Sequence, residues 1–249
     1  MKNFGLIIPT IEKEDYILGG YGSLPEDIIQ PDGQWDTVTK EYQNLFGTES
    51  QACTSFGTLN CVETLAKKQY KEINKSDRWL AKKSDTNPYA GNNPHKVAEV
   101  LRKLGVCDQE DWDFTSDIQT PEDFYKEPPQ ELDNKALKFL QTYDFKHEYV
   151  PTDTNSLKRA LTFSPIGMSV FAWHRISDYY TKPNGSTDNH WVMCYGYIGD
   201  KWKIFDSYDN SFKFYKGTPM IAKRYWIQKK KTKLSLYQML CKILSKIFQ

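Results

Sequence analysis

The spacing of apolar residues in this 249-residue chain changes near residue 146, and that change constrains the fold more than any other feature. Between residues 41 and 145 apolar residues recur at three- and four-residue steps, as in half-buried helices. From 146 to 228 the apolar runs are short, rich in β-branched and aromatic residues, and separated by turn residues. The sequence therefore predicts an α+β fold with a helical lobe over 41–145. A second lobe, an antiparallel and barrel-like sheet, is expected over 146–228 and the mostly irregular residues 1–40.

Helix ends and apolar stripes place four helices, and Thr120-Pro121 marks the start of another that Pro128-Pro129 interrupts. The first is predicted to run from Cys53 to about Lys71, with one buried stripe. The second has Asn93 as its N-cap, Pro94 in its first turn and Gly105 as its C-cap. The buried stripe of the first helix consists of Phe56, Leu59, Val62, Leu65 and Ala66. The two remaining helices are predicted at 132–143 and 154–161. These helices leave the part after residue 161 for strands.

Strands are expected at 166–173, 191–198, 202–205, 212–215 and 224–227. Gly199-Asp200 is a turn signal between the second and third of these runs. The two strands should therefore form an antiparallel hairpin.

A basic, amphipathic segment, 229–249, follows the two lobes. Its apolar residues over 234–248 fall on one helical stripe, while its lysines lie elsewhere on the wheel. Three interpretations stay open: the helix packs on its own protein, docks on a protein partner, or lies on an anionic membrane surface. The first two are favoured because most amphipathic helices are half buried in protein.

The overall charge and the cysteines exclude several classes of function. The net charge of +1 gives no global field that would attract nucleic acid. Five cysteines, at 53, 61, 107, 194 and 241, show no zinc-site spacing, so no metal or other cofactor is predicted. An odd, scattered set also argues against a disulfide framework. The apolar run at the start is too short for a signal peptide, so a cytoplasmic location is expected.

Cys53 lies at the predicted start of a helix, where unpaired N–H groups and the helix dipole favour a thiolate over a thiol. Taken alone, such a cysteine is more often a small buried apolar residue. His190 changes this interpretation, because it opens a buried strand 137 residues later. Asp206 follows after 16 more residues, at the far end of the next strand, and the hairpin would bring it close to His190. His95 and His147 are expected to be solvated.

Three short motifs resemble those of the papain family of cysteine peptidases. They are Cys53-Thr-Ser-Phe56, Asn189-His190 with Gly196-Tyr197, and Asp206-Ser207-Tyr208. The family's motifs read Cys-Trp-Ala-Phe, (Asn/Asp)-His-Ala with Gly-Tyr, and Asn-Ser-Trp. The resemblance covers about residues 20–228 and implies the papain-like two-lobed fold, with 1–228 as one peptidase domain. It is nearest to divergent members of phages and their bacterial hosts, which adds virion association as an expectation.

The resemblance also implies roles for individual residues. Cys53 would be the nucleophile and His190 the base, and Asp206 would orient the imidazole and raise its pKa. Tyr208 would shield the contact between His190 and Asp206 from water. Gly91 and Asn92 would form the backbone strip that pairs with substrate. Asn189 and Trp191 are also expected near the substrate.

The chain departs from the family at the oxyanion hole. The family's glutamine lies six residues before the cysteine, where this chain has Gly47. Gln43 would require a four-residue insertion, and Gln51 lies only two residues before Cys53. Gln43 is favoured because the residues before it resemble the family's approach to its glutamine. No segment resembling an inhibitory propeptide is visible, so control by such a segment is not expected.

Three functions remain for comparison with the structure. The first is a cysteine peptidase that cleaves polypeptides through an acyl-enzyme. The second is a catalytically silent papain-like protein with a structural, virion or assembly role, since folds host inactive relatives. The third is a Cys-His-Asp acyl transferase or amidase, whose Cys–His spacing is typically shorter than that of Cys53 and His190.

Overall fold

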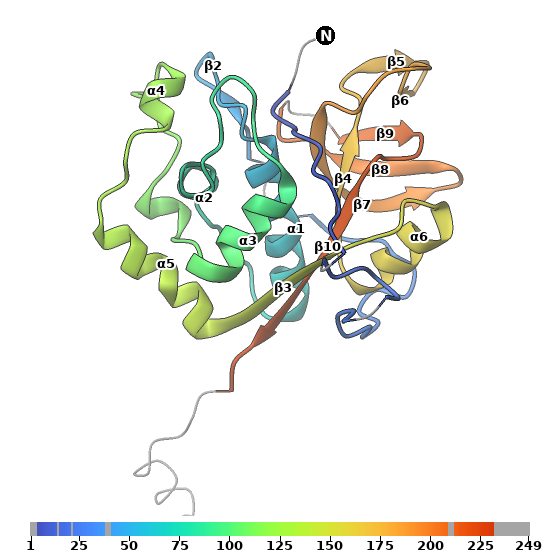
Figure 1. Cartoon of the computed structure of the whole chain (residues 1–249), viewed down its shortest axis with the longest axis horizontal. Helices are drawn as coiled ribbons and strands as arrows, with labels where there is room; N and C mark the ends of the chain where they lie inside the picture. Colours follow the sequence, from blue (N-terminus) through green and yellow to red (C-terminus); the bar gives the residue numbers. More distant parts are fainter. Residues whose placement is uncertain (1–3, 14, 21, 38–40, 209–211, 232–249) are drawn as a thin grey trace, which may run out of the picture.

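The computed structural model describes residues 4–13, 15–20, 22–37, 41–208 and 212–231. Two lobes lie side by side, one helical and one built on a sheet (Figure 1). The helices of the first lobe are α1 (Cys53–Gln69), α2 (Asp77–Lys83), α3 (Pro94–Leu104), α4 (Pro121–Phe124) and α5 (Glu131–Thr142), with a 3₁₀ turn at Gln109–Asp111. The predicted order of a helical part followed by a β part is confirmed.

Helix α1 lies between the lobes and packs against α2 and α3 on one side and against β7 and β10 of the sheet on the other. Every residue from Cys53 to Ala66 is buried. The expectation of a single buried stripe was therefore wrong, because the helix is covered by protein on all sides. Gly57 makes one close contact possible, since a Cβ there would overlap the Trp191 indole.

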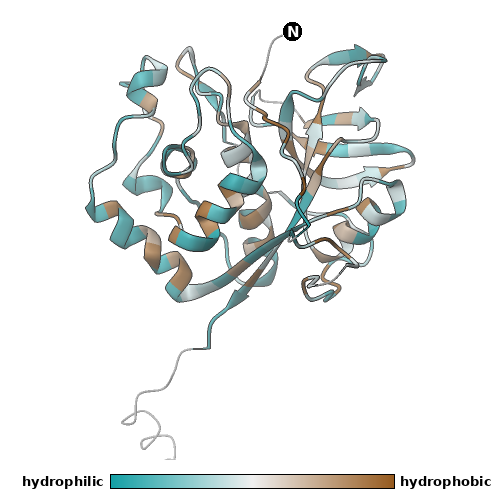
Figure 2. Cartoon of the chain, in the orientation of Figure 1, coloured by the Kyte–Doolittle hydropathy of each residue, from teal (hydrophilic) through white to brown (hydrophobic). Residues whose placement is uncertain are grey.

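The caps of α3 follow the prediction. The Asn93 side chain accepts a hydrogen bond from the Lys96 N–H, Pro94 is the first helical residue, and Gly105 ends the helix with a φ of 76°. In Figure 2, α3 and α5 show alternating hydrophilic and hydrophobic faces, as expected of helices half buried in a core. Among the described residues, no helix is long and apolar enough to cross a membrane.

The large sheet has the strand order β3-β10-β4-β7-β8-β9-β6-β5. All neighbours pair antiparallel except β6 and β9, which are parallel. Helix α6 (Thr154–Phe163) contacts β4 and β7. The strands are β3 (Tyr143–Tyr149), β4 (Ile166–Val170), β5 (His174–Ile176), β6 (Tyr179–Thr181), β7 (His190–Ile198), β8 (Lys201–Phe205), β9 (Phe212–Lys216) and β10 (Ala222–Lys229). The five predicted strands are all present, whereas β3, β5 and β6 were not predicted.

The chain's first described residues run between the two lobes, as the dark-blue trace in Figure 1 shows. Leu6 forms a parallel bridge with Asn92 of the helical lobe, and Ile17 forms one with Tyr149 in β3. Residues 1–40, which the sequence assigns mostly to the β lobe, therefore make backbone contacts with both lobes. The predicted helix at 234–248 lies outside the described residues.

Candidate active site

Cys53 is the first residue of α1, and the chain before it makes a sharp turn. A two-stranded hairpin, β1 (Asn44–Leu45) with β2 (Thr48–Glu49), leads to Gln51, whose φ is 56°. The Cys53 side chain is fully buried and belongs to an apolar cluster with Leu6, Trp191 and Ile221. The thiol therefore lies at a helix N-terminus in a dry environment between the lobes.

His190 begins β7, and Asp206 directly follows the end of β8. The two strands pair antiparallel, with Met193 opposite Phe205, and a register shift between Cys194 and Gly196. The His190 Nε2 atom lies 2.6 Å from Asp206 Oδ1, and neither side chain is exposed to solvent. The hairpin thus brings the two residues together as the sequence argument required.

The environment of His190 favours the charged imidazolium. Burial alone would lower the pKa of the imidazole, but the Asp206 charge and hydrogen bond, with a further interaction from Cys53, raise it to about 10. Burial would likewise raise the pKa of the Asp206 carboxyl, but the positive charges of His190 and Lys213 keep it below its ordinary value. The prediction that an aspartate raises the pKa of His190 is confirmed.

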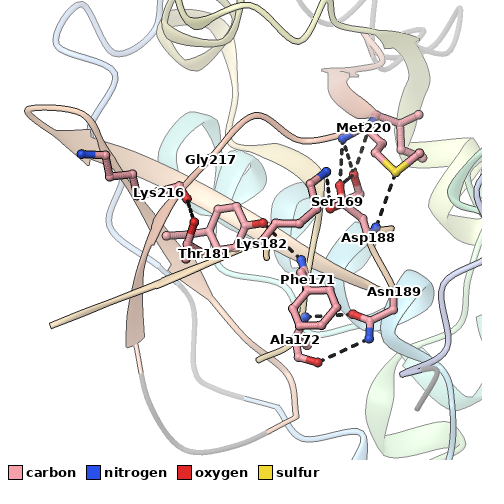
Figure 3. A network of polar contacts seen from close by, with 12 residues as sticks. Ser169, Phe171, Ala172, Thr181, Lys182, Asp188, Asn189, Lys216, Gly217 and Met220 are labelled. Carbon is pink, nitrogen blue, oxygen red and sulfur yellow. Dashed lines mark hydrogen bonds and ion pairs between the residues drawn. The ribbon is translucent and has the colours of Figure 1, made fainter. Parts of the chain in front are cut away.

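The segment before His190 is fixed by a polar network (Figure 3). Asp188 Oδ2 accepts hydrogen bonds from Ser169 Oγ at 2.6 Å and from the Met220 N–H at 2.8 Å. The Asn189 side chain accepts a bond from the Ala172 N–H at 2.8 Å. The Asn189 side chain thus anchors the loop after β4, while the backbone carbonyl oxygen of Asn189 accepts a bond from the Phe4 N–H at 3.1 Å.

A lysine that sequence reasoning missed contacts Asp206. Lys213 Nζ lies 2.7 Å from Asp206 Oδ2, and its side chain is only 1% exposed. Strand β9 buries Lys213 and Tyr215 while Phe212 and Phe214 are 45% and 38% exposed. Alternating hydrophobicity would favour the opposite face, so the only available signal was a charge between two strand-forming aromatics.

Gln43 and Gln51 occupy different places in the loop before α1. The Gln43 side chain is buried, accepts a bond from Ser207 Oγ at 2.9 Å and donates one to Glu49 Oε1 at 3.0 Å. The hairpin of residues 44–49 follows it, and the Ser50 N–H then returns to the Gln43 carbonyl oxygen at 3.2 Å. Gln51 instead presents its backbone to the cleft, where a Cβ on Gly5 would overlap it.

Residues 4–8, which we call the cleft segment, lie beside Cys53 and His190: Leu6 clusters with Cys53, and the Phe4 ring packs against His190. The main chain of the cleft segment pairs with the predicted substrate strip, since the Asn92 N–H donates to the Gly5 carbonyl at 3.0 Å and the Ile7 N–H donates to the Asn92 carbonyl at 2.8 Å. The Phe4 carbonyl oxygen lies 3.3 Å from His190 Nδ1. A Cβ on Gly91 would overlap the Gly5 backbone, so a glycine is needed there for this approach. The chain thus carries its own occupant of the cleft, which was not expected.

The aromatic residues around His190 have distinct roles. The Tyr208 ring lies edge-on to His190 with centroids 6.3 Å apart, and its N–H donates to Asp206 Oδ1 at 3.0 Å. The Phe4 ring packs against both, with its centroid 5.2 Å from that of Tyr208 and 5.9 Å from that of His190. Trp191 is fully buried, with its indole against Gly57 and Gly167. It therefore supports the floor under Cys53 rather than presenting its ring to the cleft surface.

A cavity of about 670 Å³ lies elsewhere, around α3, β3 and the chain between residues 15 and 25. None of the Cys53, His190 and Asp206 side chains lines it. His147 lines this cavity and is only 6% exposed, with Nε2 3.0 Å from Glu99 Oε1. The expectation that His147 is solvated was therefore wrong, because β3 turns its side chain inward.

Cys53, Cys61, Cys107 and Cys194 are all buried and free. No group of three or more His, Cys, Asp or Glu side chains within the described ranges could hold a metal ion.

Comparison with known proteins places the fold. No family model matches the sequence, and no curated protein matches it significantly. Xylellain, a cysteine protease from Xylella fastidiosa, aligns over 93% of this chain and 97% of its own with a TM-score of 0.64, at 19% identity. The bromelain protease from Ananas comosus in complex with E-64 aligns over 76% of this chain and 93% of its own, with a TM-score of 0.58 and 16% identity.

A third solved structure, a Carica candamarcensis cysteine protease in complex with E-64, gives the same result. It covers 79% of this chain and 94% of its own, with a TM-score of 0.58 and 15% identity. The chain therefore has the papain-like α+β fold that the motifs implied, and it matches papain-like cysteine proteases in structure. These likenesses establish the fold, and the chemistry has to be argued from the residues.

Proposed function

We propose that this protein is a papain-like cysteine peptidase that hydrolyses peptide bonds through Cys53, His190 and Asp206. The observation that carries the proposal is the buried 2.6 Å bond between His190 and Asp206, beside a cysteine at the N-terminus of α1. A nucleophile, a base and a group that orients the base are the parts that covalent acyl transfer needs. The fold supports the same chemistry, because the site lies between the two lobes.

The proposed reaction has two steps. The Cys53 thiolate attacks the carbonyl carbon of the peptide bond, and the electron pair of the C=O bond moves to the oxygen. The intermediate collapses as the imidazolium of His190 donates its proton to the leaving amine, which leaves a thioester on Cys53. His190, now neutral, takes a proton from water, and the resulting attack releases the carboxylic acid and restores the thiolate. Asp206 holds the ring orientation throughout.

Negative charge on the carbonyl oxygen requires hydrogen-bond donors. We assign this role to the Cys53 backbone N–H and the Gln43 amide, because Gln43 is buried beside Ser207, the neighbour of Asp206. The hairpin at 44–49 accounts for the longer separation from Cys53, since it forms a side loop that closes back on Gln43. Gln51 stays the second candidate.

Peptide substrates can bind only after the cleft segment leaves. Residues 4–8 already use the hydrogen-bonding groups of Asn92 and lie against His190 and Cys53. The strip at Gly91 and Asn92 would then pair with a substrate's main chain. The occupied cleft is also the observation that favours the alternative of a silent relative. No observation in the described residues specifically favours an acyl transferase. The compared structures do not bear on the expectation of a phage or virion role.

Labelling with E-64, combined with a peptide-cleavage assay, tests the proposal. The full chain and a Gly5→Ala variant, which should loosen the cleft segment, are treated at neutral pH, and the labelled residue is located by mass spectrometry. We expect labelling and cleavage to depend on Cys53 and to be lost in Cys53→Ala. Cys61→Ala, a change in the same buried helix, is the matched control and should retain both. Absence of labelling in Gly5→Ala would favour the silent relative, and labelling without cleavage would favour a transferase.

A further inference from the structure

The aspartate in the candidate triad creates a charge problem. A thiolate and an imidazolium balance one another, as they would beside the neutral asparagine of the family motif. Asp206 adds a second negative charge, and its side chain is completely buried. An unbalanced buried charge is strongly unfavourable, so another positive group is needed close by.

Lys213 supplies that positive group. Its Nζ lies 2.7 Å from Asp206 Oδ2, while His190 Nε2 lies 2.6 Å from Oδ1, so the two cations bind different oxygens of one carboxylate. The ammonium is also 4.7 Å from the centre of the Trp173 ring, which favours a cation further. The carboxylate is therefore held from both sides in one orientation.

The orientation of β9 indicates that burying Lys213 is unfavourable for the packing of apolar side chains. Lys213 points inward opposite Ile204 of β8, and the exposed Phe212 and Phe214 point outward. Turning the strand over would bury the rings of Phe212 and Phe214 in exchange for that of Tyr215 and would free a lysine, which hydrophobic burial alone would favour. The pairing of Lys213 with Asp206 offsets that preference.

We propose that Lys213 is a positioning residue of the active site, which neutralises and orients Asp206 so that an aspartate can do the work of a neutral asparagine. The proposal rests on the proposed function for its catalytic consequence, but the charge balance itself can be measured without catalysis. Two anions, Cys53 and Asp206, would then face two cations, His190 and Lys213.

The test is a double-mutant cycle with Asp206→Asn and Lys213→Gln. The His190 imidazole is titrated by NMR in protein labelled at histidine, and its signals are assigned by their loss in His190→Ala. Asp206→Asn should make His190 release its proton at lower pH, because a negative charge is removed. Lys213→Gln should make it hold the proton to higher pH, because a positive charge is removed. The double variant should titrate between the two.

Cleavage in the Gly5→Ala background gives the catalytic side of the cycle. Each single change should lower kcat/KM by roughly tenfold or more, and the double change, whose two amides can hydrogen-bond each other, should recover most of that loss. Lys213→Arg keeps the charge and should titrate like wild type. Lys216→Gln, an exposed lysine on the same strand, should change neither measurement. An unchanged His190 titration in Lys213→Gln, or additive losses in the double variant, would overturn the proposal.

The test still gives an answer if a variant does not fold or if no variant cleaves peptides. If Lys213→Gln alone does not fold, the double variant carries the test, because it restores charge balance, and its failure to fold would also overturn the proposal. If no variant cleaves peptides, the proposed function fails while the NMR titrations still decide the role of Lys213.

Discussion

The Phe4 carbonyl oxygen lies 3.3 Å from His190 Nδ1, on the opposite side of the ring from the bond between Nε2 and Asp206. Both ring nitrogens of the candidate base are therefore engaged, one by its triad partner and one by the cleft segment. Any reaction at Cys53 has to begin with an exchange of the Phe4 contact for a substrate. Substitutions in the cleft segment should therefore change how readily Cys53 can be reached.

Gly5→Ala should open the cleft. Gly5 has a φ of 98°, and a Cβ there would overlap the Gln51 carbonyl. The strain and the overlap together are expected to weaken the closed form by about 1–2 kcal/mol, which corresponds to roughly a tenfold gain in open molecules. The rate of Cys53 alkylation by iodoacetamide measures the gain.

Gly19→Ala is the matched control for this experiment. Gly19 has a φ of 75°, but nothing lies within 4 Å of a Cβ built there. The variant also places an alanine at a positive φ but without the overlap, so its alkylation rate should stay near that of wild type. Equal rates in Gly5→Ala and wild type would mean that the cleft segment does not control access.

The pH dependence of cleavage should report the charged state of His190. Its raised pKa means that the imidazolium is present at lower pH and is lost as the pH rises through about 10. Since the imidazolium donates the proton to the leaving amine, kcat/KM should fall on the alkaline side near that pH. Stopped assays across pH 6–11, roughly the range spanned by an ordinary and this raised imidazole pKa, would check it. A fall near the ordinary value of about 6.5 would contradict the ion-pair geometry.

Substitutions of the two glutamines should separate the candidates for the oxyanion hole. Loss of one donor typically lowers kcat by about 10²–10³-fold, so Gln43→Ala should lower kcat strongly and change KM little. Gln51→Asn serves as the control, because asparagine tolerates the positive φ of 56° at that position. A larger loss of kcat in Gln51→Asn than in Gln43→Ala would reverse the assignment.

The sequence was sufficient for those parts of the fold that depend on local pattern. The caps at Asn93 and Gly105 and the hairpin turn at Gly199-Asp200 are local signals, and they placed α3 and the pairing of β7 with β8. That hairpin was enough to bring His190 and Asp206 together. The papain-like motifs extended the same reasoning to the whole fold, which the structural likenesses support.

Features set by tertiary contacts could not be read in this way. Lys213 points inward because Asp206 needs a counter-charge, although Phe212 and Phe214 favoured the other face. The cleft segment holds its place through the backbone of Asn92, which leaves no pattern in residue types. Strand β3 alternates buried and exposed side chains only over residues 143–147 and follows α5 without a connecting loop, so the sequence did not separate it from the helix. Each of these depends on a partner far away in the chain.

A buried acidic cluster near α1 should make the stability of the fold depend on pH. Asp77, at the start of α2, is only 1% exposed. Its burial raises the pKa of the carboxyl well above the ordinary value, and the negative charges of the neighbouring Glu41 and Glu63 raise it further. The protonated carboxyl is compatible with this site and the carboxylate is not. The contribution of the protonated form to stability is therefore present at low pH and is lost as the pH rises through the raised pKa.

Asp77→Asn removes the titration while keeping the shape of the side chain. The variant should gain about 1–3 kcal/mol over wild type at pH 8, or roughly 2–10 °C in Tm, and the difference should shrink toward pH 4. Thermal unfolding followed by circular dichroism measures both. Asp178→Asn is the comparison, because Asp178 is exposed and pairs with Lys201, which lowers its pKa. It should gain no stability at pH 8, and a similar gain in both variants would rule out the buried cluster as the cause.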